Sequence, residues 1–137
     1  MAERPATDKQ RYEALSDFRY QLRRFLRFSE DAARSEHITA LQYQLLLHTQ
    51  GFAGRDWATV GELAERLQAQ PHGVVALVTR CEEAGLVQRR TSAADRRQVE
   101  VHLLPAGRHK LARLAPQHAG QLAALNAAVR TASRLRD

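Results

Sequence analysis

The chain has 137 residues, enough for one domain or for one domain with dimerising extensions, and 44% of them are hydrophobic, which is sufficient for a core. The formal net charge of +6 favours a polyanionic partner, nucleic acid first, although it also suits an anionic membrane surface. No apolar run approaches the ~20 residues of a membrane span, and residues 1–7, expected as a loose arm, lack the apolar centre of a signal peptide. One cysteine excludes an internal disulfide framework and fits a reducing compartment, so we expect a cytoplasmic protein without a membrane partner.

Residues 8–35 are predicted to form a long amphipathic helix. Its apolar stripe repeats at alternating spacings of three and four residues, at Leu15, Phe18, Leu22, Phe25 and Ser29. Several arginines lie on the other faces, but acidic residues dilute them. We therefore expect this helix to pack against a partner helix and not to lie on a membrane. A Thr-x-x-Gln capping box at Thr39 then predicts a second helix, which continues to Gln50 and ends at Gly51.

The centre of the chain predicts a helix-turn-helix. Thr59 and Glu62 form a Thr-x-x-Glu capping box, so a helix should begin directly after Thr59. After a short break, Pro71 suits the first position of the next helix, and Gly85 suits the left-handed residue that ends it. Two short helices joined by a turn form this motif, whose second helix can lie in a DNA major groove.

A basic hairpin follows the helix pair. Residues 86–91 and 98–104 are predicted strands, because the second alternates apolar and polar residues, and 57–59 is expected to add a short strand to their sheet. Arginines of the hairpin concentrate positive charge on it: Arg89, Arg90, Arg96 and Arg97. A thin basic hairpin beside a helix-turn-helix is a winged helix, with the wing placed to touch phosphates or to enter a minor groove. The alternative is that these arginines only solvate a hairpin.

The C-terminal part predicts two more helical segments. Pro105 begins a helix, Pro116 should kink or break it, and a heptad-like apolar stripe continues from residue 117 on. Two amphipathic ends therefore flank the winged helix. Because a single stripe of this kind cannot bury itself alone, we expect both ends to pack on each other and on those of a second copy in a homodimer. The predicted fold class is mainly α with a small antiparallel β-ribbon.

Three segments carry a resemblance to a known family. They are Glu82-Glu83-Ala84-Gly85-Leu86-Val87-Gln88-Arg89-Arg90, Asp95-Arg96-Arg97 and Leu103-Leu104-Pro105-Ala106-Gly107-Arg108. Together they resemble the MarR (multiple antibiotic resistance regulator) family of bacterial transcription factors, and the likeness extends back through residues 38–43 to the first helix. It implies one MarR-type domain over 1–137, with a winged helix-turn-helix lobe at 38–104 and dimerisation helices at 8–35 and 105–137.

The second helix of the motif should read the DNA. Three residues of its first turns are expected closest to base edges: Gln70, His72 and Gly73. Gln can pair with adenine, and His can donate to guanine or to phosphate, whereas Arg80 on the outward side should meet phosphate. Val75 and Ala76 stand where members of the family often carry polar readers. Apolar contact with a thymine methyl group is one role for them; otherwise specificity comes from the wing and DNA shape, or affinity is modest.

The wing offers its own DNA contacts. Arg97 is the candidate for insertion into the minor groove, and Asp95 should brace its guanidinium through a charge-assisted hydrogen bond. Arg89, Arg90 and Arg96 are expected to contact phosphates. The alternative for Asp95 and Arg97 is a surface ion pair worth ~0–1 kcal/mol.

An effector pocket is implied by the resemblance alone, between the dimerising helices and the DNA-binding lobe. Its candidate lining residues are Tyr20, Arg23, His37, Tyr43 and Trp57. An arginine beside aromatic rings could hold a carboxylate or phenolate, but the sequence favours a core position for each of the aromatic residues. Cys81 lies on an apolar helix face, which favours a buried, inert thiol over a redox sensor.

Motifs of enzymes and metal proteins are not found. The sequence has no Gly-x-Ser-x-Gly motif and no phosphate-binding glycine loop, and its histidines form no pair at ligand spacing on one helix. Glu82 and Glu83 are adjacent on a helix, so they do not share a face and are expected in solvent. We therefore expect no enzyme, no metal and no cofactor.

The prediction is a sequence-specific transcriptional regulator that binds a pseudo-palindromic operator in double-stranded DNA. The resemblance implies a repressor whose DNA affinity is modulated by a small aromatic or anionic effector. The alternatives are a winged-helix module that binds protein through its second helix, and a sequence-blind DNA-binding architectural module.

Overall fold

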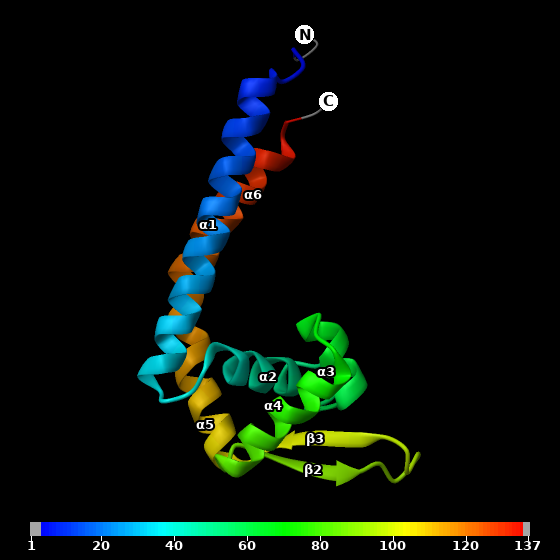
Figure 1. The fold of residues 1–137 in the computed structure, drawn as a ribbon. Coiled ribbons are helices and arrows are strands. Elements are labelled where there is room, and N and C mark those ends of the chain that lie inside the picture. The colour runs from blue at the N-terminus through cyan, green and yellow to red at the C-terminus, as the bar shows by residue number, and fades with distance from the viewer. Residues whose placement is uncertain (1–3, 136–137) are drawn as a thin grey trace. The chain divides into compact units, whose positions relative to one another are not determined.

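The computed structural model describes residues 4–135, so the expected loose arm at 1–7 lies partly outside the described residues. Figure 1 shows helices and strands in the order α1 (Asp8–Ser35), α2 (Ala40–Gln50), β1 (Trp57–Thr59), α3 (Val60–Leu67), α4 (Pro71–Glu83), β2 (Val87–Thr91), β3 (Val99–Leu103), α5 (Pro105–Leu114), the 3-10 turn η1 (Ala115–His118) and α6 (Ala119–Ser133). The predicted fold class, mainly α with a small antiparallel sheet, is confirmed.

The contacts divide the chain into two compact units. We call residues 33–115 the winged-helix lobe, and the described residues 4–32 and 116–135 the helical unit. Helix α5, which the sequence assigns to the dimerisation helices, packs on α2 and β3 within the lobe. The reason is that its apolar face, with Leu111 and Leu114, is buried in the lobe core.

The lobe contains one antiparallel sheet in the order β1-β3-β2. The short strand β1 pairs Trp57 with His102, so the two-stranded hairpin gains the third strand that the sequence predicted. Helix α2 packs on α3, α4, α5 and the sheet, and its Leu45 and Leu46 are completely buried. The sheet therefore holds the base of the hairpin against the helix core, while the residues beyond the strands form the tip.

The helix ends follow the local signals. The Thr39 and Thr59 hydroxyls each accept a hydrogen bond from the backbone N–H three residues later. In return, the side chains of Gln42 and Glu62 accept from the backbone N–H of Thr39 and Thr59, so both capping boxes are confirmed. Pro71 is the first residue of α4, and Gly85, with φ +75°, takes the left-handed conformation just after it. These two ends fix the length of the second helix of the motif.

Gly107 explains the Pro-Ala-Gly sequence after the wing. A Cβ at this position would collide with the carbonyl oxygen of Leu86, and it would also touch the Leu46 side chain. The same carbonyl accepts a hydrogen bond from the Leu104 backbone N–H at 2.9 Å. Only a glycine allows the first turn of α5 to approach the start of β2 this closely.

In the helical unit a buried histidine packs against α1 close to Pro116, where the C-terminal helix is interrupted. The Ser29 Oγ and His118 Nε2 atoms lie 2.7 Å apart, and both side chains are buried. The rings of Phe25 and Phe28 lie with their centroids 5.7 and 5.3 Å from that of His118. Pro116 interrupts the C-terminal helix with a 3-10 turn, as predicted, and the turn buries His118 against α1.

The apolar stripes of the helical unit are only partly covered. Leu15 of α1 keeps 56% of its surface exposed, and Leu122 and Val129 of α6 keep 52% and 43%. Within residues 4–135, none of the helices combines the length and the apolar character needed to cross a bilayer.

Candidate nucleic-acid interface

The N-terminal half of α4 offers an exposed face to a ligand. Val74, Leu77 and Val78 are buried in the lobe, so the opposite side of the helix faces solvent. That side carries Gln70, Pro71, His72, Gly73, Val75, Ala76 and Arg80. The Gln70 side chain makes no capping bond and Pro71 has no N–H, so no side chain caps the start of α4, where the positive end of the helix dipole lies.

Neither packing nor backbone conformation requires a glycine at position 73 of α4. A Cβ built on it meets no atom within 4 Å, and its φ is not positive. Its lack of a side chain therefore adds to a smooth, small-residue surface beside Val75, which is 46% exposed.

The hairpin tip is tied by hydrogen bonds around Asp95. One Asp95 carboxylate oxygen accepts from the Arg97 backbone N–H at 3.0 Å and from Arg97 Nε at 3.2 Å, so the expected brace is present. The Asp95 backbone N–H donates to the buried Ser92 hydroxyl, and the Asp95 carbonyl accepts from the Gln98 N–H. The Arg97 side chain itself remains 91% exposed. The tip thus presents the Arg97 cation on a locally ordered turn.

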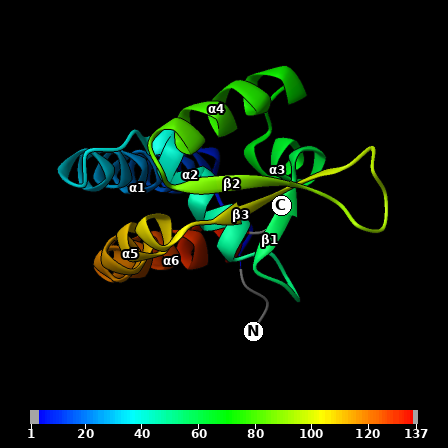
Figure 2. The same ribbon diagram turned by 90° about the horizontal axis from the view of Figure 1, so that it is seen from below.

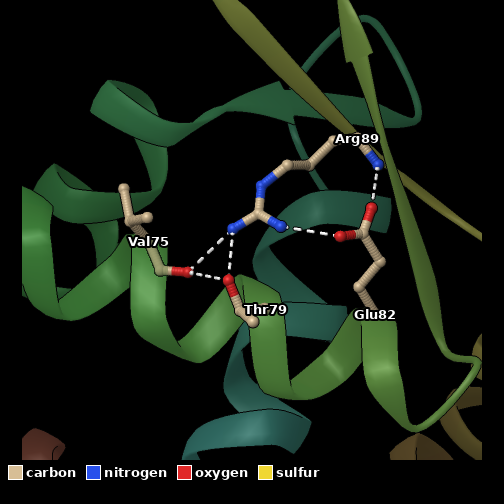
Figure 3. A network of polar contacts seen from close by, with 4 residues as sticks. All are labelled: Val75, Thr79, Glu82 and Arg89. Carbon is tan, nitrogen blue, oxygen red and sulfur yellow. Dashed lines mark hydrogen bonds and ion pairs between the residues drawn. The ribbon is translucent and has the colours of Figure 1, made fainter.

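The Arg89 side chain forms hydrogen bonds to α4 (Figure 3). Its Nη1 donates to Glu82 at 2.6 Å, while Nη2 donates to the Thr79 hydroxyl at 2.7 Å and to the Val75 carbonyl at 2.9 Å. The backbone N–H of Arg89 reaches the second Glu82 oxygen at 3.0 Å. The structure therefore turns toward α4 a side chain that the sequence assigned to phosphate.

Glu82 is the residue that sequence reasoning missed, because it was expected in solvent together with Glu83. The backbone N–H of Arg89 lowers the pKa of the Glu82 carboxyl, burial opposes this shift, and the Arg89 side chain adds to the lowering. Glu82 lies on α4 seven residues before its partner on β2. A contact of that kind depends on how the strand folds back over the helix, so the local pattern carries no signal for it.

The remaining arginines of the interface are exposed. They are Arg80 on α4, Arg90 on β2 and Arg96 at the tip. Arg90 makes a long hydrogen bond of 3.4 Å to the Gln88 side chain. Figure 2 shows the N-terminal end of α4 and the hairpin tip on the same side of the lobe. The start of the helix predicted to read bases and the tip of the wing thus lie on one side of the lobe.

The candidate effector residues fall in both units. Tyr20 and Arg23 lie close together on an open face of α1 in the helical unit, and Tyr20 is 57% exposed. The other three belong to the lobe. His37 is exposed, with φ 62°, in the turn before α2, and Tyr43 is 5% exposed, with burial raising the pKa of its hydroxyl. The Trp57 ring already has partners within the lobe, because it stacks on His102 and the Arg55 guanidinium lies 3.9 Å from its ring centroid.

The thiol and the potential metal ligands are also placed by the structure. Cys81 is fully buried, and burial raises the pKa of its thiol to about 11, which makes it a poor nucleophile at neutral pH. Among residues 4–135, no group of three or more His, Cys, Asp or Glu side chains comes close enough to hold a metal ion.

A helix-turn-helix followed by a hairpin whose third strand precedes the helix pair defines the winged-helix class. Residues 38–98 match the model of the MarR family. Over 96 residues the chain is 31% identical to a Thauera aromatica protein described as a transcriptional regulatory protein for the hcr operon, a match that covers 70% of this chain. The chain spans only 56% of that relative's length.

Solved structures show the same fold. AbsC, a MarR family transcriptional regulator from Streptomyces coelicolor, is 22% identical with a TM-score of 0.70, over 88% of this chain and 80% of AbsC. The M. tuberculosis transcriptional regulator MOSR, solved in complex with DNA, is 24% identical with a TM-score of 0.61, over 80% of this chain and 77% of MOSR. The family-model match and the 31% identical relative confirm the resemblance that the sequence predicted and place the chain in the MarR family, while the solved structures show that its fold is the same.

Proposed function

We propose that this protein is a sequence-specific DNA-binding transcriptional regulator that reads a pseudo-palindromic operator. The observation that carries the proposal is that the exposed start of α4 and the Arg97 tip lie on one side of the lobe. A helix can enter the major groove there while the wing reaches the adjacent minor groove or backbone. The DNA complex of MOSR supports this use of the fold. Such a role requires the compartment that holds the genome, which in a bacterium is the cytoplasm.

The same proposal includes a homodimer. Leu15, Leu122 and Val129 expose apolar surface on two helices of the helical unit, and a second copy of the chain would cover such stripes. Two copies would also present two reading helices, as a palindromic site requires. Sedimentation equilibrium should then give twice the chain mass of 15.4 kDa.

Effector control is the finer part of the proposal. The DNA binding of BpsR from Bordetella bronchiseptica, which is 19% identical with a TM-score of 0.62, is described as regulated by 6-hydroxynicotinic acid. We propose a repressor that a small aromatic or anionic ligand releases from DNA, with the open face of α1 at Tyr20 and Arg23 as one candidate contact. The lobe candidates Tyr43 and Trp57 would serve only if the ligand displaced their present contacts.

The test is selection of binding sequences from a pool of random duplexes, followed by fluorescence anisotropy with the recovered sequence and a shuffled one. We expect a site with dyad symmetry, bound at least about 10³-fold more tightly than the shuffled duplex. Repeating the titration with a panel of aromatic carboxylic acids should identify an acid that weakens binding. Equal affinity for both duplexes would overturn sequence-specific regulation and favour the architectural alternative.

A protein-binding module is the second candidate, favoured by the apolar surface that Val75 and Ala76 add to α4. If the wild-type chain binds no duplex at low salt, this second candidate replaces the first. In that case a Val75→Asp variant should weaken association with the protein partner.

A further inference from the structure

Arg89 lies on the inward face of β2, just beyond the buried part of that strand. Side chains alternate along a strand, so Val87 and Arg89 share one face, and Val87 is fully buried. The backbone of Arg89 is paired with Val101 of β3, which fixes the position of the side chain in the sheet. The guanidinium is therefore directed at α4 instead of following the hairpin tip outward.

The acceptors of Arg89 lie along one face of α4. Val75, Thr79 and Glu82 are spaced by four and three residues, which places them in line on a helix. A planar guanidinium with fixed donor directions can contact all of them at once, which an ammonium group cannot. The bonds span two turns of the helix, so they resist both sliding and rotation of the strand against it.

The charge of Arg89 is balanced inside the lobe. Its backbone N–H and guanidinium both donate to the Glu82 carboxylate, and these bonds lower the pKa of that carboxyl. Three of the five N–H donors of the guanidinium are used within the lobe, and the Glu82 carboxylate already neutralises its charge. The side chain is only 28% exposed, against 91% for Arg97, which points away from direct phosphate binding by Arg89.

We propose that Arg89 is a positioning residue: with Glu82 as its counter-ion, it fixes the wing against the reading helix and so sets where Arg97 stands relative to the start of α4. This inference rests on the proposed DNA-binding function, and it replaces the phosphate contact that the sequence suggested for Arg89. We call the bonds of Arg89 to Val75, Thr79 and Glu82 the clamp. The clamp also occupies the Thr79 hydroxyl, so this group is not available for a hydrogen bond to a base.

The experiment compares Glu82→Gln with Glu83→Gln. Each variant removes one negative charge next to a polyanion, so simple electrostatics makes both bind the selected operator duplex more tightly. The clamp predicts the opposite sign for Glu82→Gln alone: about tenfold weaker binding, because a charge-assisted hydrogen bond is lost. Glu83 is exposed on the same helix and serves as the matched control, with binding unchanged or slightly tighter.

Two further variants keep the test sharp. Arg89→Lys retains the charge but not the planar set of guanidinium donors, so it should weaken operator binding about as much as Glu82→Gln. The variant with both changes should bind only slightly more weakly than either single variant. Thr79→Val removes only the hydroxyl and should have a smaller effect in the same direction, which keeps the inference testable if Glu82→Gln does not fold. A phosphate contact predicts instead that Arg89→Lys binds nearly normally.

Amide hydrogen exchange of the wing tests the clamp without DNA. Residues 92–98 should exchange faster in Glu82→Gln than in wild type, and at the wild-type rate in Glu83→Gln. If wild type binds no duplex while this pattern holds, the proposed function fails and the clamp stands. Unchanged exchange in Glu82→Gln, or operator binding as tight as that of wild type, would overturn the inference.

Discussion

Asp95 holds Arg97 through a single carboxylate oxygen, which accepts both the backbone N–H and the Nε of that arginine, at 3.0 and 3.2 Å. The bond to Nε does not use the terminal nitrogens of the guanidinium, and the side chain is 91% exposed at the hairpin tip. The ion pair adds little to stability at such an exposed place. Its consequence is instead that the backbone of the tip is tied at Arg97 while the terminal guanidinium nitrogens stay available to a ligand.

We expect Arg97→Ala to weaken operator binding and to reduce the slope of log K against log salt concentration by ~1, because one positive charge that releases counterions from the DNA is lost. The measurement is fluorescence anisotropy over a series of salt concentrations. Arg27→Ala on α1 removes the same charge from an exposed position of the helical unit, and it should leave the slope nearly unchanged. An unaltered affinity and slope for Arg97→Ala would remove the wing tip from the interface.

Gly73 gives a prediction in which stability and binding move in opposite directions. Alanine at this position meets open space in a helix, so Gly73→Ala should stabilise the lobe by about 0.5–1 kcal/mol. If the start of α4 packs closely into a groove, the added methyl group should weaken operator binding. Chemical denaturation and anisotropy on the same sample measure both effects. Gly120→Ala in α6 is the control, with a stability gain of the same origin and no change in DNA affinity.

Local signals explain how much of the fold the sequence could predict. Capping boxes, Pro71 and Gly85 act within one or two turns, so they placed the ends of the central helices correctly. The Asp95 brace was predictable for the same reason, since its partner is two residues away.

Contacts between distant segments were not predictable in this way. The Arg89 clamp requires β2 to fold back along α4, and a sequence window shows only four arginines in a hairpin. The placement of α5 in the lobe also depends on tertiary packing, because its Leu111 stripe could equally serve a dimer interface. The effector candidates Tyr43 and Trp57 show the same limit, since a buried aromatic and a ligand-binding aromatic share one sequence pattern.

Gly107 and Gly61 form a matched pair of helical glycines with opposite expected effects. Gly107→Ala would drive a methyl group into the Leu86 carbonyl, a backbone atom, so we expect it to lower the free energy of unfolding by about 1–3 kcal/mol. Gly61→Ala in α3 meets no atom and should raise it by about 0.5–1 kcal/mol. Urea denaturation at a fixed protein concentration compares the two. Equal stability of both variants would contradict the close approach of α5 to the Leu86 carbonyl.

The Glu82 carboxylate should make the stability of the protein depend on pH in a predictable direction. Its pKa is lower in the folded state than its ordinary value, first because the Arg89 backbone N–H donates to it and then because of the Arg89 side chain. A lowered carboxyl pKa contributes stability that is fully present above the ordinary value of about 4.3 and is lost as the pH falls through the folded-state value. The difference in unfolding free energy between wild type and Glu82→Gln should therefore be largest at neutral pH and shrink in acid.

Other carboxylates of the lobe also lose stability in acid, so wild type alone cannot isolate Glu82. The pKa of Glu36 is lowered by its hydrogen bond from Arg113, and that of Glu62 is lowered by its capping bonds and by Arg55. Both groups remain in Glu82→Gln, so their contributions cancel when the two proteins are subtracted at each pH. Urea, which is uncharged, suits the measurement. A difference that is constant from pH 7 down to below the ordinary carboxyl pKa would mean that Glu82 gains nothing from its bonds to Arg89.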